Sequence, residues 1–168
     1  MEKSHLYQFT LKHLAAYCSK AERCSYDIRR KLSVTELSEE EQAEILQRLR
    51  AEKFVDDLRY AISFCRDKYR FNGWGQIKIV HALRAKQISS ETVQEALSQL
   101  QSQLVDRGES SVEHLYGLMR RKYESISAST PTNKLFAKLI RWAMSRGFGY
   151  EEAKQAYSKL NIGEVPDE

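Results

Sequence analysis

Two short runs of the chain combine basic and aromatic side chains in the same order. Residues 66–69 read Arg-Asp-Lys-Tyr, and residues 120–123 read Arg-Arg-Lys-Tyr. Guanidinium and ammonium groups bind phosphate or carboxylate oxygens, and a tyrosine beside them can anchor a partner. The same bases also complement the C-terminal end of a helix. For the tyrosines, packing on a neighbouring helix is the better interpretation, whereas for the bases both interpretations stand.

Further bases recur at related places, so the sequence predicts a line of positive charge rather than one patch. Such a line suits a phosphate backbone or an acidic groove, although long basic side chains also cover apolar helix edges. Trp74, between Gly73 and Gly75, is either an exposed partner-binding residue or, by preference, an anchor of the turn. The candidate partner-binding residues are Lys78, Arg84, Lys86, Arg66, Lys68, Arg120, Arg121, Lys122, Lys138 and Arg141.

Signals for catalysis or metal binding are poor. The motifs GxxxxGK[ST], HExxH and GxSxG do not occur. The adjacent acids Asp56 and Asp57 could hold a metal, but no further ligand stands nearby in sequence, and helix capping explains them. Cys18, Cys24 and Cys65 form no CxxC pair. We therefore expect no enzyme activity, no metal and no cofactor, and three buried free thiols in a reducing cytosol.

The charge is distributed unevenly along the 168 residues, whose net charge is +4. Residues 36–57 carry eight acids and three bases, whereas residues 66–86 carry six bases and one acid. Residues 119–146 carry seven bases and one acid. An acidic first part followed by basic parts suggests an oriented polyanionic or mixed-charge partner, although a normally solvated surface explains the distribution equally well.

The elements that must position these residues are helices, and their apolar pattern recurs three times. The spacing places each set on one helical face, at intervals of about 50–60 residues. In the first helices, Leu14 and Cys18 align with Ala61 and Cys65. The other aligned sets are Ile28, Ile79 and Leu139; Leu32, Leu83 and Ala143; Leu37, Ile88 and Phe148; Leu46, Leu97 and Tyr157; and Leu49, Leu100 and Leu160.

This recurrence predicts an all-α fold of three tandem three-helix, helix-turn-helix-like repeats in an elongated, curved array. The expected repeats are residues 1–54, 55–106 and 107–168. No apolar stretch approaches the roughly 20 residues of a membrane span. The opening Met-Glu-Lys-Ser-His lacks the apolar core of a secretory signal. We therefore expect a cytoplasmic protein without membrane contact.

Several local signals predict where helices begin. Ser38 and Glu41 form an S-x-x-E capping box, and Ser25 can cap the helix that follows the first one, which we expect over residues 6–22. Thr130 and Pro131 are expected to be a cap followed by proline at the first helical position.

Three blocks of sequence, in this order and spacing, resemble the RecX family of recombinase regulators. The first reads Ser-Tyr-Asp-Ile-Arg-Arg-Lys-Leu over 25–32, and the second Phe-Val-Asp-Asp-Leu-Arg-Tyr-Ala over 54–61. The third reads Gly-Gln-Ile-Lys-Ile over 75–79 and continues as Leu-Arg-Ala-Lys-Gln-Ile over 83–88. Gln87 stands where the family usually has glycine. The motif residues are Asp56, Asp57, Arg59, Tyr60, Ile79, Leu83 and Ile88.

The resemblance implies a non-enzymatic, three-helix-repeat protein that binds the RecA recombinase filament and most often limits its activity. It also implies possible contact with single- or double-stranded DNA, which we expect to be weak and sequence-tolerant. An alternative is a DNA-binding protein that uses helix-turn-helix-like units, and an enzyme with an unrecognised site is the least favoured alternative. We expect the free protein to be a monomer.

Overall fold

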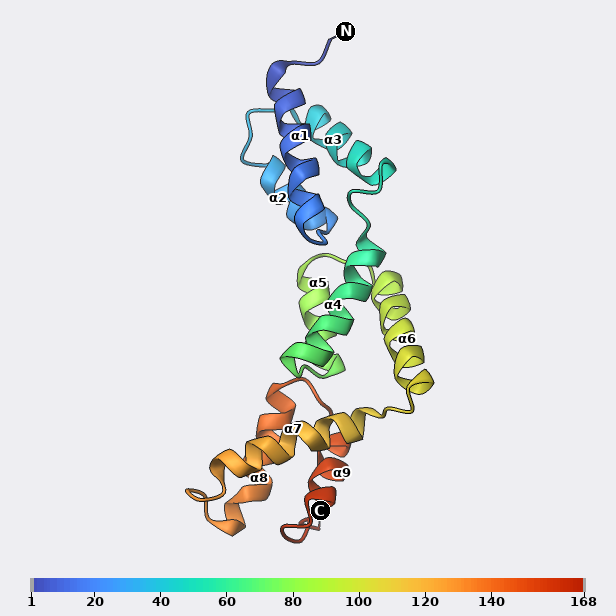
Figure 1. The fold of residues 1–168 in the computed structure, drawn as a ribbon. Helices are drawn as coiled ribbons and strands as arrows, with labels where there is room; N and C mark the ends of the chain where they lie inside the picture. Colours follow the sequence, from blue (N-terminus) through green and yellow to red (C-terminus); the bar gives the residue numbers. More distant parts are fainter. Residues whose placement is uncertain (1, 168) are drawn as a thin grey trace. The chain divides into compact units, whose positions relative to one another are not determined.

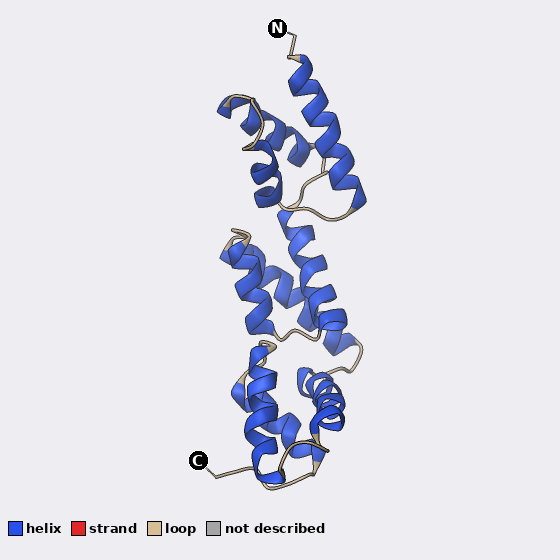
Figure 2. Cartoon of the chain, turned by 90° about the vertical axis from the view of Figure 1, so that its left-hand side faces the viewer, coloured by secondary structure: helices blue, strands red, loops and turns tan. Residues whose placement is uncertain are grey.

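The structure, a computed structural model, describes residues 2–167, and this part of the chain forms nine helices and no strand (Figure 1, Figure 2). The predicted all-α fold of tandem three-helix repeats is confirmed. None of these helices combines the length and the apolar composition that a membrane crossing needs. The helices are α1 (His5–Lys20), α2 (Ser25–Leu32), α3 (Glu39–Ala51), α4 (Asp57–Asn72), α5 (Gln76–Ala85), α6 (Ser90–Asp106), α7 (Ser111–Ile126), α8 (Thr132–Ser145) and α9 (Tyr150–Leu160).

The helices form three repeats, α1–α3, α4–α6 and α7–α9, and we call them repeats 1, 2 and 3. The apolar positions that the sequence aligned in the second and third helices of each repeat are buried, except that Leu160 is partly exposed. Burial of these equivalent positions confirms the predicted recurrence, because each set stabilises its repeat by removing the same apolar face from water.

The first helices need a different alignment. α1 and α4 have 16 residues each and begin at residues 5 and 57, an interval of 52, while α2 and α5 begin at residues 25 and 76, an interval of 51. The buried Leu14 therefore corresponds to Cys65 and not to Ala61, and Cys18 corresponds to Tyr69. The sequence prediction slipped by one helical turn, which leaves the apolar face almost unchanged.

Two compact units divide the described chain. The first holds the residues up to 63 together with 83–96, and the second holds 64–82 together with the residues from 97 onward. The core of the first unit comes from α1, α2 and α3, and that of the second from α7, α8 and α9. Each unit thus contains one complete repeat and part of repeat 2. The repeat boundaries predicted at residues 54 and 106 stay predictions.

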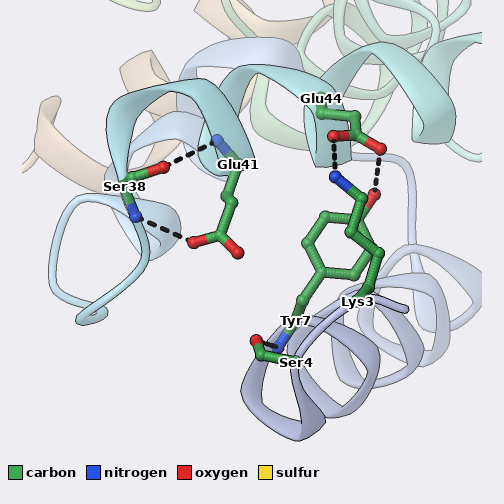
Figure 3. A network of polar contacts seen from close by, with 6 residues as sticks. All are labelled: Lys3, Ser4, Tyr7, Ser38, Glu41 and Glu44. Atoms are coloured by element: carbon green, nitrogen blue, oxygen red, sulfur yellow. Dashed lines mark hydrogen bonds and ion pairs between the residues drawn. The ribbon is translucent and has the colours of Figure 1, made fainter. Parts of the chain in front are cut away.

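Local capping explains where several helices begin. Ser38 and Glu41 form the predicted reciprocal capping box at the start of α3 (Figure 3). Ser4 caps α1 by accepting from the Tyr7 N–H, and the Tyr7 hydroxyl donates to Glu44 of α3 over 3.1 Å. These contacts satisfy otherwise unpaired amides and join the two helices.

Three predicted helix ends differ from the structure. α1 ends at Lys20 because Ala21 is extended. Ser25 is the first residue of α2 rather than its cap, and the N-cap is Cys24. Pro131 is the N-cap of α8 and not its first helical residue. The predicted cap of α2 thus lies one residue after the observed one, and the predicted cap of α8 lies one residue before it. A cap depends on backbone angles that neighbouring elements help to set.

The turn after α5 contains a left-handed residue that is not glycine. Gln87 has a φ of 55°, and the following Ile88 N–H donates to the Leu83 carbonyl over 3.2 Å. At the end of α8, Gly147 has a φ of 94°, and Phe148 donates to Ala143 over the same distance. The left-handed conformation explains why glycine suits this position.

Candidate partner-binding surface

The two adjacent acids of the second motif block cap two different helices. Asp56 accepts a hydrogen bond from the backbone N–H of Arg59, so it caps α4 as predicted. Asp57 instead accepts from the backbone N–H of Ser25, over 2.7 Å, and so caps the start of α2. The prediction that both acids cap the following helix was therefore half wrong. Asp57 thus joins repeat 2 to repeat 1, whereas Asp56 serves its own helix.

Arg59 and Tyr60 extend the same contact. The Arg59 guanidinium binds Glu22, which follows α1, over 2.7 Å, and it also donates to the Lys53 carbonyl. Tyr60 is half-buried, and burial together with the nearby Cys24 thiol raises its pKa to about 12. These motif residues thus join two repeats rather than face a ligand.

Lys86, predicted as a partner-binding residue, has partners within its own unit. Its ammonium group donates to Asp27 over 2.6 Å and lies 5.5 Å from the centre of the Tyr26 ring. Burial alone would raise the pKa of Asp27, but hydrogen bonds from Lys86 and Cys24 outweigh it and lower this pKa. Hydrogen bonding to Asp27 raises the pKa of Lys86. We call these contacts, which link the end of α5 to the start of α2, the first junction.

The second unit contains the corresponding contact between repeats 2 and 3, which we call the second junction. Gly75 donates its backbone N–H to the carbonyl oxygen of Arg146 over 2.7 Å, and Ile77 donates to that of Gly147 over 3.0 Å. The two backbones lie so close that a Cβ atom on Gly75 would lie 2.4 Å from the carbonyl carbon of Gly147. Backbone contact here replaces the side-chain ion pair of the first junction.

A cation–aromatic cluster adjoins the second junction. The ammonium groups of Lys68 and Lys78 lie 4.9 Å and 4.5 Å from the centre of the Trp74 ring, and Phe64 meets this ring edge-on at 6.2 Å. Trp74 is half-buried, so it anchors its turn and also exposes part of its indole. The structure thus brings together Lys68, Lys78 and Trp74, three of the residues that the sequence singled out. Phe64, which had no distinguishing sequence signal, completes the cluster.

The candidate bases of repeat 3 lie on two helices. Arg120 and Arg121 on α7 are exposed, and Arg120 approaches Glu124 only at 3.9 Å. Lys138 and Arg141 on α8 are exposed and line a hollow of about 370 Å³ with Lys134, which the sequence reading had not selected. Three bases at positions i, i+4 and i+7 share one helical face. This face of α8 therefore groups two candidate bases, Lys138 and Arg141, with one further base, Lys134.

The remaining candidates are more scattered. Arg84 is exposed, Lys122 is half-buried and Arg66 binds its neighbour Asp67 over 3.0 Å. The motif residues Ile79 and Leu83 are fully buried, and Ile88 is nearly so, which makes all three core residues.

The buried groups that could do chemistry have structural surroundings. All three cysteines are free and buried, as predicted, and burial raises the pKa of Cys24 and of Cys65 to about 11. Within residues 2–167 no group of three or more histidine, cysteine or acidic side chains could hold a metal ion. Neutral thiols of this kind pack as small apolar groups rather than react.

Fold and surface first define a class: an all-α protein of tandem three-helix repeats whose exposed bases suit the binding of a macromolecule. Two family models then match the chain. RecX, second three-helix domain, covers residues 56–97, and RecX, third three-helix domain, covers residues 109–157. The chain belongs to the RecX family of regulatory proteins.

Curated relatives and solved structures agree with this assignment. "Regulatory protein RecX" of Streptococcus gordonii is 28% identical over 155 residues, which cover 91% of this chain and 56% of that protein. The relative of the same name from Clostridium beijerinckii is 28% identical over 88% of this chain and 66% of its own length. The chain thus spans between half and two thirds of these relatives. A crystal structure of RecX from Lactobacillus salivarius shares the fold, with a TM-score of 0.77, 20% identity and coverage of 93% and 97%.

Proposed function

We propose that this protein binds the RecA recombinase filament and slows its ATP hydrolysis or strand exchange. The observation that carries the proposal is the match of repeats 2 and 3 to the second and third RecX domains, in the order and spacing of the family. The exposed bases of repeat 3 support it, because an exposed cationic face increases the rate of encounter with an acidic or nucleoprotein surface.

The contact residues are best sought among bases that do not hold the fold together. Lys86 binds Asp27, and the Lys78 ammonium group lies 4.5 Å from the centre of the Trp74 ring beside the second junction. Replacing either one disturbs the protein itself. Arg120, Arg121 and Arg141 are exposed, so their replacement tests binding with little effect on stability.

The test compares two triple charge reversals that change the net charge equally. In one variant Arg120, Arg121 and Arg141 become Glu, and in the control Lys12, Lys20 and Arg107, also exposed, become Glu. We expect the first variant to lose filament binding and inhibition of the RecA ATPase, while the control keeps both. Equal melting temperatures would show that both variants fold. An unmodified protein that neither co-sediments with the filament nor alters its ATPase contradicts the proposal.

The alternative function, direct DNA binding, is favoured by one observation. Lys134, Lys138 and Arg141 surround the hollow at the start of α8, and such a row suits a phosphate backbone. If the filament is the main partner, the expected binding to naked DNA is weak and sequence-tolerant. Each neutralised phosphate should then add about 0.9 to the negative slope of log affinity against log salt. Tight, sequence-dependent binding to naked duplex would favour this alternative over the filament.

A further inference from the structure

Two neighbouring hollows of repeat 3 lie along α8. The basic hollow of about 370 Å³ described above lies at the start of this helix, and a second hollow of about 590 Å³ lies towards its end. Ala137 and Arg141 line both hollows, so the two form one continuous strip. We call this strip the α8 face, and the residues that define it are Lys134, Ala137, Lys138, Arg141, Met144 and Tyr150.

The α8 face follows one side of its helix. Positions 134, 137, 141 and 144 are three or four residues apart, which places them on one side of an α-helix. α8 has 14 residues, so this side is about 21 Å long at about 1.5 Å per residue. A long strip of this kind suits a helix laid beside it, because side chains spaced in the same way on that helix meet the strip along its length.

The first half of the α8 face is cationic and lacks an internal counter-charge. Lys134, Lys138 and Arg141 are exposed, and none of them forms an ion pair within the described chain. Lys138 donates to the Thr130 hydroxyl over 3.3 Å, a neutral group that leaves its charge uncompensated. Of the residues that the structure describes, no acidic one lines either hollow. Electrostatic complementarity therefore favours an anionic occupant.

The second half of the α8 face is apolar. Met144 is 51% exposed and Tyr150 38%, while Ile140 beneath them is almost fully buried. A methionine side chain is flexible and adapts to apolar groups of different shapes. Covering it with an apolar side chain of a partner removes hydrocarbon from water and so stabilises the complex.

The apolar half favours a protein occupant over a nucleic acid. A phosphate backbone would satisfy the bases, but it offers no aliphatic group to cover Met144. Bases of a single strand stack on exposed rings. The Phe136 ring is partly buried and meets the Tyr157 ring edge-on at 4.9 Å, and the Lys154 ammonium group lies 5.9 Å from the centre of the Tyr150 ring. Only a protein segment supplies carboxylates and aliphatic side chains together.

The position of Lys138 contacts protein in the other two repeats. In each repeat this position directly precedes the first aligned residue of the second helix. In repeat 1 it is Asp27, which binds Lys86 of repeat 2 over 2.6 Å. In repeat 2 it is Lys78, which lies so close to repeat 3 that a Cβ atom on Gly147 would be 2.4 Å from the Lys78 Cβ. The fold thus uses this position for protein contacts, and at Asp27 the partner carries the opposite charge.

We propose that the α8 face binds an acidic amphipathic helix of a partner protein. Carboxylates of that helix pair with Lys134, Lys138 and Arg141, and its apolar side chains cover Met144. Amphipathic helices bind through anchors spaced by three and four residues, which is the spacing of the α8 face. The proposal deepens the proposed function by naming the chemistry of the partner segment, and it rests on that function only for the identity of the partner.

Fluorescence anisotropy with the full chain and a labelled peptide tests the proposal. The probe is a helical peptide of about 16 residues, with glutamates followed by leucines on one face. We expect a dissociation constant between about 1 µM and 100 µM, in the range of weak specific contacts. Replacing the glutamates of the probe by glutamine, or its leucines by serine, should each weaken binding at least about tenfold.

Two variants of the chain separate protein from nucleic acid as the occupant. Lys138→Glu should weaken peptide binding at least about tenfold. Met144→Ser should weaken it at least about threefold, but it should not change the binding of a single-stranded oligonucleotide. The matched controls Val105→Ser and Arg107→Glu change exposed residues at the end of α6 and directly after it, and both should bind the peptide as the wild type does. Equal melting temperatures would show that all variants fold.

Four results would overturn the proposal. The first is a wild type that does not bind the peptide up to about 1 mM. The second is peptide binding that neither Lys138→Glu nor Met144→Ser weakens, which places the site elsewhere. The third is an oligonucleotide that displaces the peptide and binds more tightly, which assigns the α8 face to nucleic acid. The fourth is self-association of the wild type that Lys138→Glu abolishes, which assigns it to a second copy of the chain.

The peptide assay contains no recombinase, so its failure is distinct from failure of the proposed function. A chain that binds the peptide but not the RecA filament contradicts the proposed function and leaves the α8 face with an acidic helix as its occupant. A chain that binds the filament but not the peptide contradicts only the assignment of the α8 face.

Discussion

The backbone N–H of Gly75 donates to the carbonyl oxygen of Arg146 over 2.7 Å, so the start of α5 is capped by the end of α8. The contact joins two helices of different repeats through main-chain atoms alone. Helix starts leave unpaired N–H groups and helix ends leave unpaired carbonyls, so each end satisfies the other. The opposed dipole ends also attract one another.

This approach requires glycine, and Gly75→Ala tests it. The added Cβ would lie 2.4 Å from the Gly147 carbonyl carbon and 2.5 Å from the Phe148 nitrogen, which are backbone atoms that cannot turn away. We expect a loss of at least about 2 kcal/mol in unfolding free energy, because the second junction must open. Chemical denaturation measures it.

Gly117→Ala is the matched control for that substitution. Gly117 lies inside α7, and an added Cβ meets no atom within 4 Å. Alanine should stabilise this helix by about 0.5–1 kcal/mol, because glycine loses more backbone entropy on folding. Equal and small effects at Gly75 and Gly117 would contradict the close backbone approach.

Lys86→Ala should cost more than a substitution at an exposed base. It removes a 2.6 Å donor from Asp27, whose side chain is only 17% exposed, and leaves the acid with the Cys24 thiol. The expected loss is about 1–2 kcal/mol, since a partly buried acceptor is left underpaired. Arg84 is exposed and stands two residues before Lys86. Arg84→Ala should therefore change the unfolding free energy by no more than about 0.5 kcal/mol.

The pH dependence of that loss has a defined sign. The pKa of Asp27 is lowered in the folded protein from its ordinary value of 3.8, so its contribution is fully present above pH 3.8. It disappears as the pH falls through the folded pKa. The difference between wild type and Lys86→Ala should therefore shrink in acid, and a constant difference down to pH 2 would speak against the ion pair.

Much of the fold could be predicted because its signals are local. The capping box of Ser38 and Glu41 lies within four residues, and the apolar period of each helix sets its buried face. The role of Asp57 could not be predicted, because its acceptor bond reaches Ser25, 32 residues earlier in the chain. The same holds for the α1–α4 alignment, since a one-turn slip keeps Leu14 and Cys18 opposite apolar residues.

The candidate site was predictable only in part. Charge counts identified the basic segments, but a count does not tell whether an ammonium group faces solvent or an internal acid. Lys86 was grouped with Arg84 as a contact residue, yet one pairs with Asp27 and the other is exposed. The sequence could not decide whether Trp74 is packed or exposed, because its flanking glycines allow both. In the structure the Trp74 side chain is half-buried.

Gln87→Gly should stabilise the protein. Gln87 adopts a φ of 55°, a conformation that costs a side chain more than it costs glycine. Its side chain makes only an exposed hydrogen bond with Arg29, at 3.2 Å. The expected gain is about 0.5–1 kcal/mol, measured by thermal or chemical unfolding. Arg84→Gly, inside α5, should lose about 1 kcal/mol, and a loss at both positions would show that strain at Gln87 is unimportant.

His114 should make the second junction sensitive to mild acid. Its Nε2 lies 3.0 Å from the Tyr69 carbonyl oxygen, and its ring stacks on the Tyr69 ring. Burial lowers its pKa from the ordinary 6.5; Arg70 and Arg121 add to this lowering, and the Tyr69 carbonyl and Glu109 oppose it.

Because the folded pKa of His114 is below the unfolded one, the unfolded chain takes up the proton first as the pH falls. The stabilising contribution is therefore complete above pH 6.5 and is lost progressively below it. His114→Phe keeps an aromatic ring for stacking and removes the titration. Its unfolding free energy should change less steeply with pH than that of the wild type between about pH 5 and 6.5, the range in which unperturbed histidine titrates. Equal slopes for the two proteins would show that His114 has the same pKa in both states.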